Sequence, residues 1–111
     1  MMAGEIALAE LQQADGRLKA RPVFILTQMP PFSAHLVCAL SSKLHHECPG
    51  FDEVVATGDD DYPESGLKVP SLIRLGMVAT LPDSAILGTI GKISAARLER
   101  LKSRLARHIT R

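Results

Sequence analysis

Residues 21–27, RPVFILT, carry the β-strand signal around which the other predicted elements are arranged. Four consecutive apolar residues follow the Arg-Pro pair, so the strand they form cannot alternate between core and water, and both of its faces are predicted to be buried. Pro22 has no N–H to donate and fits only at the beginning of a strand.

Short apolar segments separated by Gly and Pro surround this strand. Residues 4–10 alternate as a half-buried strand does, although their Ala and Glu content equally suits a turn of helix. Residues 12–20 are polar, contain Asp15-Gly16 and are predicted to form a loop. Further strands are predicted at residues 34–40, 51–57, 67–75 and 85–93. Pro70 would place the 67–75 strand at an edge or give it a bulge.

One helix is predicted at the C-terminus. Ser94 is a good N-cap, and four apolar residues follow it at helical spacing. These residues are Leu98, Leu101, Leu105 and Ile109. Loops are predicted at 44–50 and in the acidic segment 58–66. The chain is therefore predicted to be mainly β (α+β): a single domain, residues 1–111, built as a small barrel or sandwich with one terminal helix.

Composition excludes several classes of protein. The chain has 111 residues, of which 46% are hydrophobic and 23% charged, as in ordinary globular domains. No apolar run approaches the ~20 residues of a membrane helix. The N-terminus lacks the basic and apolar segments of a signal peptide, so a cytoplasmic location is expected. Two cysteines are too few for a disulfide scaffold, and Cys38 is predicted to be a buried apolar residue.

Charge is distributed unevenly along the chain. Residues 94–111 contain six Lys or Arg and one acid, whereas the rest contains seven basic and eleven acidic residues. Exposed arginines opposite a leucine stripe usually keep a docked helix soluble, which is the interpretation we favour. Binding of nucleic acid or of an acidic protein segment is the alternative.

The ordered set of motifs resembles the PemK/MazF family. It comprises GEI at 4–6, KARPVFIL at 19–26, the segment 67–80, GTIG at 88–91 and the helix after Ser94. The resemblance spans nearly the whole chain. It implies an SH3-like barrel of the CcdB/PemK type and the activity of a toxin from a toxin–antitoxin system, an endoribonuclease that cleaves single-stranded RNA without a metal or other cofactor. It also implies a cognate antitoxin protein as partner and a homodimer with RNA in the groove between subunits.

The resemblance assigns catalysis to Arg21, in the Arg-Pro motif, and to Ser41, the hydroxyl residue at the end of the third strand. Attack of a 2′-hydroxyl on its own phosphate needs a fixed cation and hydrogen-bond donors at the phosphorane. Arginine offers planar, permanently charged donors, and a hydroxyl adds another. We further predict that four neighbouring residues bind RNA: Arg17, Lys19, Ser42 and Lys43.

Two departures from the family pattern bear on catalysis. The stretch before Arg-Pro (residues 16–18) has no acid where several members carry glutamate, and Ala39-Leu40 replaces the proline that often precedes the hydroxyl residue. A barrel that has lost catalysis and only binds a partner is therefore one alternative. A CcdB-like gyrase-binding toxin is another, but such proteins act through a C-terminal tryptophan segment and this chain has no Trp.

Histidines offer two further hypotheses. His35 or His46 is a candidate proton shuttle, because imidazole titrates near neutral pH. The segment HHEC, residues 45–48, superficially resembles a metal site. Adjacent histidines in an extended segment point to opposite sides, and no second group with zinc-like spacing accompanies them, so a solvated loop is the favoured interpretation.

Overall fold

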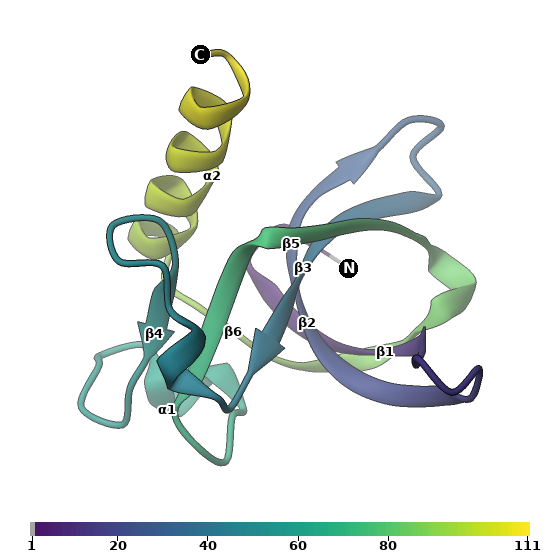
Figure 1. Cartoon of the computed structure of the whole chain (residues 1–111), viewed down its shortest axis with the longest axis horizontal. Coiled ribbons are helices and arrows are strands. Elements are labelled where there is room, and N and C mark those ends of the chain that lie inside the picture. The colour runs from purple at the N-terminus through teal and green to yellow at the C-terminus, as the bar shows by residue number, and fades with distance from the viewer. Residues whose placement is uncertain (1) are drawn as a thin grey trace.

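A computed structural model of the chain describes residues 2–111 (Figure 1). Six strands form the body of the molecule, and one long helix follows them. In chain order the elements are β1 (Glu5–Gln12), β2 (Leu18–Met29), β3 (Ala34–Ser41), the 3₁₀ turn η1 (Leu44–His46), β4 (Glu53–Val55), α1 (Tyr62–Ser65), β5 (Ser71–Pro82), the 3₁₀ turn η2 (Asp83–Ala85), β6 (Ile86–Lys92) and α2 (Ala95–Ile109).

The strands form one antiparallel sheet in the order β4-β5-β3-β2-β1-β6. Figure 1 shows this sheet curling into a half-barrel, with α2 standing at one side near the short strand β4. The predicted architecture, mainly β with one C-terminal helix, is confirmed. Residues 4–10, where strand and helical turn were both open, form a strand, because pairing with β2 and β6 overrides their helical propensity.

Strand β2 is buried on both faces, as its sequence predicts. Phe24 and Leu26 belong to one hydrophobic cluster, and Val23 and Ile25 belong to a second cluster on the opposite face. Successive side chains of a strand point to opposite faces, so alternate residues of β2 enter different clusters. Cys38 lies in the first cluster and is fully buried, which confirms its predicted role as an apolar residue.

Helix α2 covers the first cluster. Ser94 caps it as predicted, its hydroxyl oxygen accepting a hydrogen bond of 3.2 Å from the backbone N–H of Arg97. Leu98, Leu101 and Leu105 pack against the cluster, so the predicted leucine stripe is the docking face. Ile109 is 69% exposed and lies beyond this contact.

Strand β2 begins earlier than predicted, at Leu18. The polar loop is confined to residues 13–17, because the N–H of Gln13 donates to the carbonyl of Arg17 over 2.8 Å and closes a tight hairpin. Gly16 adopts φ +85°, which this turn requires and which glycine tolerates. Residues 18–20 (Leu18, Lys19 and Ala20), which were predicted to belong to the loop, therefore pair with β1.

The prediction for the 67–75 strand is wrong in its bounds. Pro70 cannot donate a ladder hydrogen bond, and β5 begins immediately after it and continues to Pro82. Because Pro70 lies outside the strand, the edge position or bulge predicted at this proline is wrong. β5 is irregular at a different place, where Ala39 of β3 pairs with Arg74 but the adjacent Cys38 pairs with Val78. The predicted 51–57 strand shortens to β4, and the acidic segment holds the unpredicted helix α1.

Two glycines let α1 and β6 touch. A Cβ on Gly66, at φ +72°, would lie 2.0 Å from the carbonyl oxygen of Ile90. A Cβ on Gly91 would lie 2.2 Å from the backbone of Ser65. Any larger residue at either position would separate the two elements, which together bound one side of the pocket described below. Within residues 2–111 no helix is long and apolar enough to cross a membrane.

Candidate functional site

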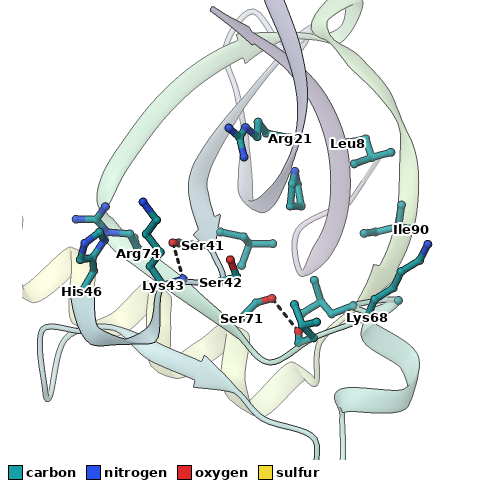
Figure 2. Close-up of a pocket in the computed structure, with 15 residues that line it drawn as sticks. Leu8, Arg21, Ser41, Ser42, Lys43, His46, Lys68, Ser71, Arg74 and Ile90 are labelled. Carbon is teal, nitrogen blue, oxygen red and sulfur yellow. Dashed lines mark hydrogen bonds between the residues drawn. The ribbon is translucent and has the colours of Figure 1, made fainter. Parts of the chain in front are cut away.

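A pocket of about 750 Å³ opens where the start of β2, the end of β3, the start of β5 and the α1–β5 loop meet (Figure 2). Its walls combine apolar side chains with several cations. The lining residues are Leu8, Arg21, Pro22, Leu40, Ser41, Ser42, Lys43, His46, Gly66, Leu67, Lys68, Val69, Ser71, Arg74 and Ile90.

Strand pairing brings Arg21 to the pocket. β2 and β3 are antiparallel, and their register ends at Val23 opposite Ala39. Arg21 lies two residues before Val23 and Ser41 two residues after Ala39, so the start of β2 lies beside the end of β3. The guanidinium of Arg21 is exposed, and its one hydrogen bond within residues 2–111 is a long contact of 3.5 Å from Nη2 to Oε1 of Gln13.

Ser41 ends β3 and shapes the turn that follows. Its Oγ accepts a hydrogen bond of 3.0 Å from the backbone N–H of Lys43. This is the backbone-satisfying role common for serine at a strand end. Because Oγ acts as acceptor, the hydroxyl proton remains available for donation into the pocket. Ser42 and Lys43 are exposed beside it.

The structure thus gathers four of the six predicted site residues, Arg21 and residues 41–43, around one pocket. Arg17 and Lys19 lie on the β1–β2 hairpin and do not line it. Lys19 shares a strand face with Arg21 by the period of two, whereas Arg17 sits in the turn, its N–H donating to Asp15 over 3.0 Å. The predicted functional roles of all six remain predictions.

Two cationic residues that line the pocket were not predicted from the sequence. Arg74 lies on β5 opposite Ala39, and Lys68 lies in the α1–β5 loop. The signal for Arg74 was present, because an arginine inside the apolar segment 71–75 must face either solvent or an anion. Figure 2 shows Arg74 beside His46 and Lys43 on one side of the pocket, with Lys68 on the other.

The two candidate proton shuttles have different environments. His46 lines the pocket, whereas His35 is 2% exposed, bonded through Nε2 to Asp83 over 2.5 Å, and absent from the lining. His35 is six residues from Ser41 along β3, or about 20 Å at the rise of a strand. The pocket therefore brings His46, and not His35, to the predicted site.

The imidazole of His46 favours its neutral form. Its pKa lies below the ordinary value for histidine, because partial desolvation and neighbouring positive charges both disfavour the imidazolium. The charged neighbours are His45, Arg74 and Lys43. A neutral imidazole near neutral pH can accept a proton. Among residues 2–111 no three His, Cys, Asp or Glu side chains converge as potential metal ligands.

The pocket cations differ from the arginines of α2 in their partners. No carboxylate lines the pocket, and within the described chain none forms an ion pair with Arg21 or Arg74. Three arginines of α2 are paired with a carboxylate instead. Glu53 on β4 contacts all three at 2.8 to 3.0 Å, namely Arg97, Arg100 and Arg104. The interpretation of these arginines as exposed solubilising groups is wrong for Arg97, which is 7% exposed.

A family-level comparison matches almost the entire chain. The sequence model of the PemK-like, MazF-like toxins of type II toxin–antitoxin systems matches residues 2–109. No curated protein matches.

Solved structures with this fold cover the chain from end to end. The toxin MazF-mt6 of Mycobacterium tuberculosis has a TM-score of 0.70 and 22% identity, covering 96% of each chain. An endoribonuclease from a mycobacterial species, solved with its cognate antitoxin, has a TM-score of 0.68 and 15% identity over 99% of this chain and 95% of its own. MazE–MazF from Deinococcus radiodurans has a TM-score of 0.70 and 13% identity over 98% and 94%. At these identities the likeness establishes the fold.

Proposed function

The chain belongs to the PemK/MazF family of type II toxin–antitoxin toxins, and from that premise we propose that it is an endoribonuclease that cleaves single-stranded RNA without a metal. The observation that carries the proposal is the pocket itself. It presents two arginines without carboxylate partners beside a hydroxyl and a neutral imidazole. Arginines without a carboxylate partner are free to bind an anion, and a phosphodiester supplies one with matching geometry.

Each group has a role in the proposed reaction. Neutral His46 takes the proton from a ribose 2′-hydroxyl, whose oxygen attacks the adjacent phosphorus. The bond from phosphorus to the 5′-oxygen breaks, and that oxygen takes a proton from water. The products are a 2′,3′-cyclic phosphate and a 5′-hydroxyl. Arg21 and Arg74 stabilise the charge on the phosphorane oxygens, and the Ser41 hydroxyl donates a further hydrogen bond.

The remaining predicted residues would hold the strand. Ser42 and Lys43 lie at the pocket rim, and Arg17 and Lys19 continue the positive surface along the hairpin. Contacts of this kind go to the phosphate backbone, so they position RNA without reading its sequence.

The test is cleavage of a mixed pool of single-stranded RNA by the purified full chain, with EDTA present throughout. We expect cuts whose upstream fragments end in cyclic phosphate and whose downstream fragments carry a 5′-hydroxyl. Loss of activity in EDTA, with recovery on adding a divalent metal, would refute metal independence. Fragments with 5′-phosphates would refute attack by the 2′-hydroxyl.

Partners follow from the same proposal. Two of the similar structures contain a toxin bound to its antitoxin, and we propose that this chain likewise binds a cognate antitoxin protein and forms a homodimer in the cytoplasm. One small half-barrel offers a pocket open on one side, so a second subunit would complete a groove long enough for RNA.

One observation favours a second candidate, a barrel that binds RNA or a protein partner without catalysis. The hydrogen-bond partner of the Arg21 guanidinium is the neutral amide of Gln13 at 3.5 Å, and residues 16–18, where several family members carry a glutamate, contain no acid. If His46 does not replace that acid, RNA would bind without being cut. The cleavage assay, together with a measurement of RNA binding, separates the two cases. RNA that binds but is not cut would identify the second candidate.

A further inference from the structure

A second hollow lies at the C-terminal end of α2, outside the pocket already described. It has a volume of about 270 Å³ and is lined by Gly50, Phe51, Arg104, Arg107, His108 and Arg111. Four of these six residues carry basic side chains, and no carboxylate lines the hollow.

The helix end alone does not explain this cluster. The negative end of a helix dipole attracts cations, so basic residues in the last turn stabilise a helix wherever they point. Here two of the basic side chains, Arg104 and His108, contact Phe51 in the neighbouring loop. Nη1 of Arg104 donates to the carbonyl of Phe51 over 3.4 Å, and the Phe51 and His108 rings lie 5.3 Å apart. Arg104 is also paired with Glu53, whereas Arg107 has no ion-pair partner within residues 2–111.

One loop joins the two sites. Residues 44–46 carry His46 into the first pocket, and Phe51, five residues later, lines the second. Five residues span at most about 18 Å even when fully extended. Figure 1 shows this segment running from the end of β3 to the side of α2.

A buried carboxylate fixes that loop. Asp52 is 7% exposed, and its Oδ2 accepts a hydrogen bond of 2.8 Å from the N–H of Cys48. Its Oδ1 accepts one of 2.9 Å from the N–H of Leu75, the residue after Arg74. The same side chain therefore holds the loop between the sites against the strand that carries a cation of the first pocket.

We propose that the hollow at the end of α2 is a second subsite for the phosphate backbone of single-stranded RNA, reached by nucleotides that extend out of the first pocket. The inference rests on the proposed RNA-cleaving function. Arg107 and Arg111 would contact phosphates, and the exposed ring of His108 offers a face on which a base can stack. An acidic protein segment would satisfy the same charges, but continuity with the first pocket favours a ligand that fills both.

The test measures binding of uncleavable 2′-O-methyl RNA to the full-length protein by fluorescence anisotropy. Oligonucleotides of about four and about sixteen nucleotides bracket the site sizes of single-strand-binding folds. The double variant Arg107→Gln/Arg111→Gln should bind the long strand about tenfold more weakly than wild type at ~0.1 M salt, and bind the short strand equally well. Its salt slope on the long strand should fall by about 0.7 for each lost phosphate contact.

Matched variants make the result specific. Lys92→Gln/Lys102→Gln removes the same charge from positions that line neither site and should bind both strands like wild type. Arg107→Lys/Arg111→Lys should retain the salt slope, because it keeps the charge. Thermal melting of each variant establishes that it is folded.

Three outcomes overturn the inference. Equal loss of long-strand affinity in both glutamine variants would indicate an effect of net charge. Unchanged long-strand affinity in Arg107→Gln/Arg111→Gln would show that these two residues do not bind RNA. Loss of binding to a polyglutamate peptide, with RNA binding intact, would assign the surface to an acidic protein. Failure of the wild-type protein to bind or cut any RNA would instead refute the proposed function.

Discussion

Arg21 is exposed at the start of a strand, where an arginine usually does no more than remain solvated. What distinguishes it is its position beside the end of β3 and across the pocket from Arg74, without a carboxylate partner in residues 2–111. A bound anion would offset the repulsion between two such cations. The two arginines therefore form a candidate site for one phosphate that they would share.

Arg21→Ala should lower the single-turnover rate of RNA cleavage by about 10²–10³-fold, the usual cost of removing one donor to a transition state. Because the side chain is exposed and makes one long hydrogen bond, the melting temperature should stay at the wild-type value. Rates are measured with excess enzyme on one labelled RNA. Arg17→Ala is the control: it should weaken binding and lower the salt slope with little effect on the bound rate. Wild-type cleavage by Arg21→Ala would contradict the assignment.

His46 makes a prediction about pH. Its pKa is lowered, so the neutral form that accepts a proton persists below the ordinary histidine pKa of 6.5. Cleavage should therefore be independent of pH around neutrality and fall only as the solution becomes more acidic than that value. The measurement is the single-turnover rate across this range. In His46→Gln the cleavage rate should be about 10²-fold lower, and its fall at acidic pH (the acid limb of the profile) should disappear.

The neighbouring imidazole supplies the control for that experiment. The positive charge of His45 is one cause of the lowered pKa of His46. His45→Gln should therefore keep the rate at neutral pH and move the acid limb toward higher pH. A limb that persists in His46→Gln would show that another group accepts the proton.

At the scale of elements, one ion-pair network fixes α2 to the rest of the molecule. Arg97 contacts Glu53, Asp59 and Asp61 at 2.8 to 2.9 Å. These acids come from β4 and the acidic segment after it. The segment that looks from sequence like a solvated acidic loop is therefore the counter-charge for the helix.

Arg97→Met should destabilise the fold by about 3–5 kcal/mol, because it leaves the carboxylate of Asp61, whose side chain is 8% exposed, buried without a cation. Urea unfolding of the purified protein measures the change. Arg100→Met is the control: its side chain is 50% exposed, and the loss should stay below about 1 kcal/mol. Equal losses for the two variants would refute the special role of Arg97.

Acid should weaken the same network. The hydrogen bond from Arg97 holds the pKa of Asp61 at about 2, well below the ordinary value of an aspartate, 3.8. A lowered folded-state pKa gives stability that is complete above about 4 and is lost as the pH falls toward 2. Unfolding free energies across this window should fall less steeply in Asp61→Asn than in wild type. Identical slopes would exclude Asp61 as a source of the acid sensitivity.

Local patterns determined which elements could be predicted. The apolar run of β2, the leucine stripe and the Ser94 cap are contained in neighbouring residues, and all three are confirmed. β5 was misplaced because its extension past Gly76 depends on pairing with β3, which no local signal announces. An arginine within the apolar segment 71–75 was a local signal for an exposed or anion-binding side chain, but the place of Arg74 in the pocket depends on the pairing of β5 with β3.

The number of subunits determines how much surface the whole molecule offers to RNA. The pocket is a depression on one side of a half-barrel, and RNA that leaves it must lie on further surface. Several apolar side chains are exposed on β5 and β6, including Met77 at 53%, Val78 at 45% and Leu87 at 54%. Single exposed apolar residues are ordinary. A second copy of the chain that covered some of them would also lengthen the groove.

We therefore expect a homodimer, with twice the 12.0 kDa mass of the chain, in light scattering at micromolar concentration. If RNA lies between the subunits, activity per chain should fall on dilution at the concentration where the dimer dissociates. Mass and cleavage rate should thus be followed over the same dilution series. A 12.0 kDa species alone at micromolar concentration would refute the dimer. A dimer whose activity per chain is unchanged after dissociation would place the complete RNA site within one subunit.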